Sequence, residues 1–157
     1  LQLEFVLTKA FRDLEATKKL REAEVVTQSL EDLRSKYRGE YAKDLALLHG
    51  DLHAGSVMVQ GNEVKVIDPE FAIYGPPGLD VGSVLFGYLF AVLCRSMKQQ
   101  SEGTDELIQC MRTVWDVYTK AMIAAGIASD MLQTISEDAV GFAACEVART
   151  ALGCAGG

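Results

Sequence analysis

A short β-branched segment interrupts a chain that otherwise favours helices, and it limits how the chain can fold. Residues 57–60 read Val-Met-Val-Gln, residues 63–67 read Glu-Val-Lys-Val-Ile, and Gly61-Asn62 stands between them. Two such stretches around a two-residue turn predict an antiparallel hairpin. A hairpin returns the chain to where it left, so Ser56 at its entrance and Asp68 at its exit should be neighbours.

The segments that the hairpin joins are rich in polar side chains. Residues 49–56 read His-Gly-Asp-Leu-His-Ala-Gly-Ser, and Asp68, Pro69 and Glu70 follow the hairpin. We expect Asp51, Asp68 and Glu70 to gather, and a divalent cation would relieve their mutual repulsion. Phosphoryl transfer to an alcohol needs one carboxylate to orient the hydroxyl and accept its proton, and others to hold the magnesium that bridges the nucleotide phosphates. The segment offers both kinds.

The remainder is predicted to be mainly helical. Residues 10–48 are charged and helix-favouring, and Gly39 should divide them into two helices or a helix and a loop. Residues 74–78, Tyr-Gly-Pro-Pro-Gly, are predicted to form a rigid loop that is neither helix nor strand. Asp80 is then a candidate N-cap. Further helices are expected over residues 81–99, 104–125 and 129–152, the last as one helix or a pair.

The second of these helices has an apolar face. Thr104 is expected to cap it and Gly126 to close it. The face recurs at helical spacing, so we assign it to the core rather than to a cofactor site. Its members are Leu107, Met111, Val114, Trp115, Tyr118 and Met122.

Composition narrows the class of protein. With 157 residues, 49% of them hydrophobic, the chain fits one domain over residues 1–157. Its formal net charge of -7, without a Lys/Arg run, argues against binding to nucleic acid or to anionic membranes. The longest apolar stretch, residues 81–94, is shorter than the roughly 20 residues of a spanning helix and is read as a buried core helix.

The cysteines indicate a reducing compartment. They are far apart, lack CxxC spacing and sit mostly among apolar residues, so we expect reduced core or near-core thiols. This favours a cytoplasmic protein. The cysteines are Cys94, Cys110, Cys145 and Cys154.

The order His-Gly-Asp, a polar residue five positions later, a hairpin and an Asp resembles the catalytic and metal-binding loops of the protein-kinase-like superfamily, which includes aminoglycoside and choline kinases. Residues 49–59 and 66–72, followed by Tyr74-Gly75-Pro76, Gly78 and Asp80, resemble the signature of the methylthioribose kinase family nearly residue for residue. Weaker similarity runs from about Phe5 to Gly153. The resemblance implies an α+β, mainly α fold: the C-terminal helical lobe of a protein-kinase-like fold, whose hairpin carries the catalytic and metal loops.

The resemblance also implies a function. It predicts ATP- and Mg²⁺-dependent phosphorylation of the 1-hydroxyl of 5-methylthioribose, in methionine salvage, by a cytoplasmic homodimer. Asp51 would be the catalytic base and contact the sugar hydroxyl. Asp68 and Glu70 would bind magnesium and, with Pro69, the ATP. Arg149 would steady the sugar or its incoming phosphate.

The two histidines and Ser56 receive supporting roles. His49 and His53 are four residues apart and would suggest a zinc pair on a helix, but Gly50 and the adjacent strand argue against a helix. We expect His49 to brace the catalytic loop through a backbone hydrogen bond and His53 to support the same loop. Ser56 stands where many members of the superfamily have a metal-binding Asn, and since its hydroxyl is a poorer ligand we predict a structural role. Asp80 should tie the Gly-Pro loop to the catalytic loop.

Two departures from the family pattern bear on activity. Thr150 replaces the second of two adjacent arginines, which removes one basic contact. No glycine-rich phosphate loop or strand lysine is present, and we expect these in an N-terminal lobe that precedes Leu1, so the isolated chain should be inactive. The alternatives are a related kinase for an amino alcohol or aminoglycoside, and a non-catalytic kinase-like remnant that binds a partner.

Overall fold

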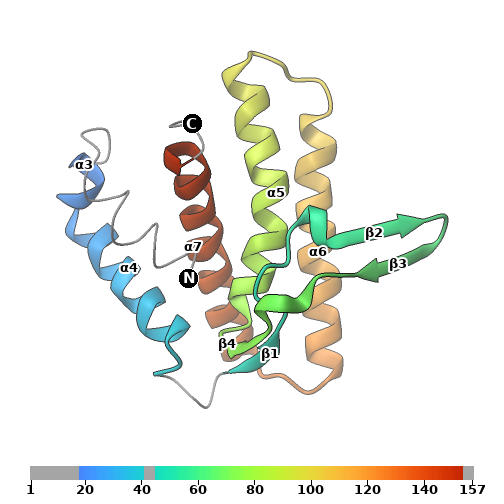
Figure 1. Ribbon diagram of the computed structural model, residues 1–157, viewed down its shortest axis with the longest axis horizontal. Coiled ribbons are helices and arrows are strands. Elements are labelled where there is room, and N and C mark those ends of the chain that lie inside the picture. Colours follow the sequence, from blue (N-terminus) through green and yellow to red (C-terminus); the bar gives the residue numbers. More distant parts are fainter. Residues whose placement is uncertain (1–17, 41–44, 154–157) are drawn as a thin grey trace.

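The computed structural model describes residues 18–40 and 45–153. Three long helices, α5 (Gly78–Met97), α6 (Thr104–Ala124) and α7 (Ser129–Gly153), lie side by side with α5 in the middle (Figure 1). Helix α4 (Glu24–Tyr37) packs against the other side of α7, preceded by the short α3 (Lys18–Arg21). The predicted mainly α fold with a small β component is confirmed, and helices cover one side of the segment that carries the chemistry.

Two small antiparallel sheets bracket the candidate site. Strand β1 (Ala46–Leu48) pairs with β4 (Ile73–Gly75), and β2 (Val57–Gln60) pairs with β3 (Glu63–Val66). The β2–β3 hairpin projects away from the helices (Figure 1). The hairpin was predicted with these bounds, apart from Ile67, which lies just beyond β3.

The β1–β4 pair corrects two predictions. Residues 46–48 belong to a stretch predicted as helical, and residues 74–75 to a loop predicted to be free of strand, yet Ala46 pairs with Gly75 and Leu48 with Ile73. These residues form strands despite their local helix propensity, because the pairing satisfies their backbone hydrogen-bonding groups and leaves Leu48 only 6% exposed.

The helix boundaries confirm the glycine signals and correct the cap assignments. Gly39 and Gly126 have φ of +76° and +85°, and each ends a helix, α4 and α6 respectively. Thr104 does not cap α6: Gly103 is the N-cap, and the Thr104 hydroxyl is buried without a partner in the described part of the chain. Asp80 does not cap α5 either, because that helix begins two residues earlier, at Gly78.

The core lies where α4, α5 and α7 meet. Its buried cluster is Leu33, Leu48, Leu79, Phe142 and Cys145. Gly82 lets α5 approach α7 closely, since a Cβ there would lie 2.6 Å from the Ala139 carbonyl oxygen. The apolar face of α6 was predicted as core but is only half-buried, because α6 packs mainly against one neighbour, α5. Of the thiols, Cys145 is buried as expected, Cys110 is exposed against expectation, and Cys154 lies outside the described residues.

A buried ion pair joins α4 to α7. Lys36 Nζ lies 2.7 Å from Asp138 Oδ1 and 2.9 Å from Asp32 Oδ2, and Asp138 is 5% exposed. Burial raises the pKa of Asp138, and Lys36 offsets this only in part. Burial alone would lower the pKa of Lys36, but hydrogen bonds and attraction to Asp138 and Asp32 leave it raised. The Lys36 ammonium therefore offsets part of the free-energy cost of burying the Asp138 carboxylate.

Among the described residues, α5 has the length and apolar composition of a membrane-crossing helix. It is longer than the apolar stretch noted in the sequence. Core helices of globular proteins share these properties, and α5 packs against both α6 and α7. A single such helix is weak grounds for assigning a membrane.

Candidate active site

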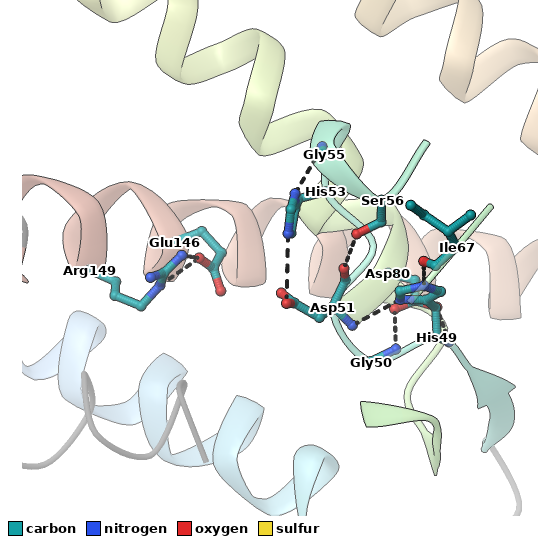
Figure 2. A network of polar contacts seen from close by, with 10 residues as sticks. All are labelled: His49, Gly50, Asp51, His53, Gly55, Ser56, Ile67, Asp80, Glu146 and Arg149. Atoms are coloured by element: carbon teal, nitrogen blue, oxygen red, sulfur yellow. Dashed lines mark hydrogen bonds and ion pairs between the residues drawn. The ribbon is translucent and has the colours of Figure 1, made fainter. Parts of the chain in front are cut away.

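The loop that follows β1 is fixed by the side chain of Asp80. Asp80 Oδ2 accepts a hydrogen bond from the His49 amide at 2.7 Å, and Oδ1 accepts one from the Gly50 amide at 3.0 Å (Figure 2). Hydrogen bonds to a carboxylate are shorter and stronger than neutral ones. Asp80 was predicted to cap a helix and to tie the Gly-Pro loop to the catalytic loop; the structure shows its bonds to the catalytic loop, made from the first turn of α5 and not as a helix cap.

His49 braces the loop on its other side. Its Nε2 lies 2.8 Å from the Ile67 carbonyl oxygen, and its Nδ1 accepts a hydrogen bond from the Asp51 amide at 3.3 Å. These partners assign the proton to Nε2, which donates to Ile67. His49 thus joins the loop before the hairpin to the residue after it, as predicted.

Gly50 allows the loop to lie against the chain that follows the hairpin. Its φ is +83°, and a Cβ there would lie 2.1 Å from the Phe71 carbonyl oxygen. Both the backbone conformation and this approach require glycine. This contact sets Asp51 beside the turn that carries Glu70.

Asp51 is held by two neighbours on its own loop. The Ser56 hydroxyl donates to the Asp51 carbonyl at 3.0 Å, and Ser56 is only 3% exposed. His53 Nδ1 accepts from the Gly55 amide at 2.9 Å, and its Nε2 lies 3.7 Å from Asp51 Oδ2 (Figure 2). The supporting roles predicted for Ser56 and His53 agree with this geometry.

The residues after the hairpin lie where its pairing places them. The Ile67 amide donates to the Ser56 carbonyl at 2.9 Å, so the two ends of the hairpin are neighbours as predicted. Asp68 adopts the left-handed region with φ of 67° and ψ of 48°. Non-glycine residues seldom adopt this conformation, which costs about 1 kcal/mol or more and is concentrated at functional sites. Pro69 and Glu70 follow in a 3-10 turn, Pro69–Phe71, that is exposed.

Two cavities meet at Asp51. The first has a volume of about 270 Å³ and includes Glu70 in its lining. The second has a volume of about 330 Å³ and includes His53 and Arg149. Residues common to both linings are Asp51, Ser83 and Glu146. Asp51 therefore stands between a side that holds Glu70 and a side that holds Arg149.

The expected cluster of three carboxylates is not found. Asp51 and Glu70 line one cavity, but Asp68 lines neither. Over residues 18–40 and 45–153, no three His, Cys, Asp or Glu side chains form a group that could hold a metal ion.

The oxygen donors nevertheless suit magnesium. Mg²⁺ is typically held by one or two carboxylates together with waters and substrate phosphates, not by a full set of protein ligands. Asp68 and Glu70 are exposed carboxylates two residues apart on the turn. Ser56 is buried against the Asp51 carbonyl and is not offered to an ion. Asp68 and Glu70 therefore offer oxygen donors of the kind that suits magnesium.

Arg149 forms an ion pair within α7. Its Nη2 and Nε lie 2.6 and 2.8 Å from a single oxygen, Oε2, of Glu146. The Glu146 side chain is 12% exposed and that of Arg149 33%. Sequence reasoning missed Glu146 and Ser83 as lining residues. The spacing of Glu146 and Arg149, three apart on a predicted helix, is a signal for an ion pair between them but not for a place in a cavity. Ser83 gave no signal.

Known proteins match the chain over most of its length. A family model described as "Phosphotransferase enzyme family" matches residues 5–111. A methylthioribose kinase of Exiguobacterium sibiricum is 40% identical over 123 residues, which are 70% of this chain and 31% of that protein. A methylthioribose kinase of Bacillus cereus is 38% identical over 82% of this chain and 35% of its own length. One of Geobacillus kaustophilus is 39% identical over 69% of this chain and 30% of its own length. The chain spans about a third of the length of these curated relatives.

The family match covers more than half of the chain and includes every residue from His49 to Asp80 that forms the loop network. The relatives confirm the resemblance drawn from the motifs. The chain belongs to the phosphotransferase enzyme family, and its similar relatives there are methylthioribose kinases.

Proposed function

We propose that this chain is the catalytic lobe of a larger kinase that transfers the γ-phosphoryl group of ATP to the 1-hydroxyl of 5-methylthioribose. The observation that carries the proposal is the position of Asp51 in the lining of both cavities. A carboxylate between an acceptor and a phosphate donor is what transfer to an alcohol requires. The names of the similar relatives supply the acceptor.

Asp51 is assigned the proton of the acceptor. The sugar hydroxyl oxygen forms a bond to the γ-phosphorus, the bond from that phosphorus to the β,γ-bridging oxygen breaks, ADP leaves, and the hydroxyl proton passes to the Asp51 carboxylate. His53, 3.7 Å from Asp51 Oδ2, helps to fix the orientation of that carboxylate. The backbone at Asp51 is held by His49 and Ser56, so the group is oriented before the substrate arrives.

The turn after the hairpin is assigned to the nucleotide. Asp68 and Glu70 would hold magnesium, which when bound neutralises charge on the nucleotide phosphates. Pro69 keeps the two acidic residues on a short turn. Glu70 lines the cavity that Asp51 also lines, and we therefore assign the nucleotide to that side.

Arg149 is assigned to the acceptor side. Its guanidinium lies in the lining of the second cavity, where it suits the hydroxyls of a sugar or an incoming phosphate. The same lining carries the carboxylates of Asp51 and Glu146, so charge does not separate a sugar from an amino alcohol or aminoglycoside. The names of the similar relatives favour the sugar. The intact Asp51 network speaks against a non-catalytic remnant. We expect a cytoplasmic homodimer, with ATP and the sugar as its small-molecule partners.

A transfer assay on the full-length protein tests this proposal. Radiolabelled ATP and Mg²⁺ are supplied with methylthioribose, choline or an aminoglycoside, and label should pass to methylthioribose. Asp51→Asn should lower kcat by at least about a hundredfold, since general bases contribute about 10²–10⁴-fold. Asp116→Asn, an exposed residue of α6, is the matched control and should retain activity.

Two results would contradict the proposal. Absence of methylthioribose-dependent transfer by the wild-type protein would remove the assigned substrate. Full activity of Asp51→Asn would remove Asp51 from the assigned role. The isolated 157-residue chain should show no turnover, and turnover by it would refute its assignment as one lobe of a larger site.

A further inference from the structure

The Glu146–Arg149 pair uses only one of the two carboxylate oxygens of Glu146. Both Arg149 nitrogens that contact Glu146 contact the same oxygen, Oε2, at 2.6 and 2.8 Å. The other oxygen, Oε1, has no hydrogen-bond partner within the described residues. A carboxylate has about four acceptor sites, so Glu146 retains acceptor capacity after it has bound Arg149.

This acceptor lies in the lining of the catalytic cavities. Glu146 lines both cavities that Asp51 lines, and Arg149 lines the second. Figure 2 shows Glu146 on the side of Arg149 that faces Asp51. The side chain of Glu146 is 12% exposed, and Oε1 is not one of the buried polar atoms that lack a partner among the described residues. Oε1 is therefore accessible from the cavities that Glu146 lines, where a ligand hydroxyl can donate to it.

A glutamate beside an arginine matches the hydroxyl pattern of a sugar. The carboxylate accepts a hydrogen bond and the guanidinium donates one, whereas each hydroxyl of a vicinal diol can donate and accept. One hydroxyl can therefore donate to Glu146 while its neighbour accepts from Arg149. An acceptor with a single hydroxyl satisfies only one member of the pair.

We propose that Glu146 is a substrate-binding residue, and that with Arg149 it recognises the vicinal 2,3-diol of the acceptor sugar while Asp51 takes the proton of the 1-hydroxyl. The inference rests on the proposed function and adds a specificity determinant to it. It also gives a reason for the ion pair: Arg149 holds the Glu146 carboxylate toward the cavity, and Glu146 holds the guanidinium there in return.

Calorimetric binding to the full-length protein tests the inference separately from turnover. Kd is measured for methylthioribose and for its 2-deoxy and 3-deoxy forms, with and without a non-hydrolysable ATP analogue, for the wild type and Glu146→Gln. The substitution preserves shape but removes the charge. Glu137→Gln, an exposed glutamate on the same helix, is the matched control.

Glu146→Gln should weaken binding of methylthioribose about tenfold, the scale of a lost hydrogen bond to a charged group. The wild type should bind one of the two deoxy sugars about tenfold more weakly than methylthioribose. For that deoxy sugar, the Kd of Glu146→Gln should lie within about threefold of the wild-type Kd. Such non-additivity is the mark of a direct contact. Glu137→Gln should match the wild type with every sugar.

The inference is overturned if Glu146→Gln binds methylthioribose as tightly as the wild type, if it weakens all three sugars equally, or if the wild type binds none of them. Should Glu146→Gln fail to fold, as judged by circular dichroism, Glu146→Asp takes its place in the same comparison. If the sugars bind with the predicted coupling but no phosphoryl transfer occurs, the proposed function fails and the diol contact stands.

Discussion

Removal of the Asp80 carboxylate should release the catalytic loop while leaving the helices in place. In Asp80→Ala, the His49 and Gly50 amides lose acceptors at 2.7 and 3.0 Å. A hydrogen bond to a charged group contributes about 1.5–3 kcal/mol. Because the Asp80 carboxylate is only half-buried, we take the lower value, and the two bonds then stabilise the loop by about 3 kcal/mol. Since 1.4 kcal/mol is a factor of ten, the equilibrium constant for opening of the loop should rise by about a hundredfold.

The assay is the steady-state kinetics of the full-length enzyme together with hydrogen exchange. Asp80→Ala should speed exchange of the His49 and Gly50 amides by about a hundredfold, because exchange follows the opening equilibrium, and should lower kcat, with far-UV circular dichroism unchanged. Asp105→Ala is the control, because Asp105 occupies the first turn of α6 as Asp80 occupies that of α5. It reports any general effect of losing a carboxylate near a helix N-terminus. Exchange rates of the His49 and Gly50 amides in Asp80→Ala within about threefold of the wild type would refute the anchoring role.

Other predictions follow from the same structure. Gly50→Ala should abolish turnover and destabilise the fold by about 2 kcal/mol or more, because of its φ of +83° and a backbone oxygen 2.1 Å from the added Cβ; a near-normal denaturation midpoint would contradict this. Burial, and then the charge of Glu146, raise the pKa of Cys145 to about 11. At pH 8 iodoacetamide should therefore modify exposed Cys110 far sooner than Cys145, as followed by mass spectrometry, and equal rates would contradict this. Lys36→Met should lower the free energy of unfolding by about 3 kcal/mol by stranding the Asp138 carboxylate, a loss that Lys36→Met/Asp138→Leu should largely recover. The pKa of Lys36 is raised from 10.5, so its contribution is complete below pH 10.5 and is lost as the pH rises through the folded-state value.

The local features of the fold were largely predictable from sequence. The Gly61-Asn62 turn fixed the register of the hairpin, and the helix-ending glycines marked the ends of α4 and α6. These features depend on a few adjacent residues. The β1–β4 pair was missed because Ala46 and Leu48 favour a helix locally and become strand only through partners 25 or more residues away in the chain.

In the candidate site, too, local features were predictable from sequence and features that depend on packing were not. The residues of the catalytic loop could be named because they form a contiguous motif, and the bracing role of His49 follows from its place before Gly50. The lining role of Glu146 could not be predicted, because it depends on how α7 packs against α5 and on which face of α7 turns toward Asp51. The position of Asp68 outside both cavities likewise depends on the backbone of a single turn. No residue in the motif predicts the left-handed conformation of Asp68.

The most direct test of the account is the identity of the product that the full-length protein forms from ATP, Mg²⁺ and 5-methylthioribose, determined by phosphorus NMR with coupling to the sugar protons. We predict a single new phosphate ester coupled to the proton on carbon 1, and no such product with Asp51→Asn. A phosphate on another hydroxyl, or ATP hydrolysis without a sugar phosphate, would contradict the assignment of Asp51 as the group that accepts the proton of the 1-hydroxyl.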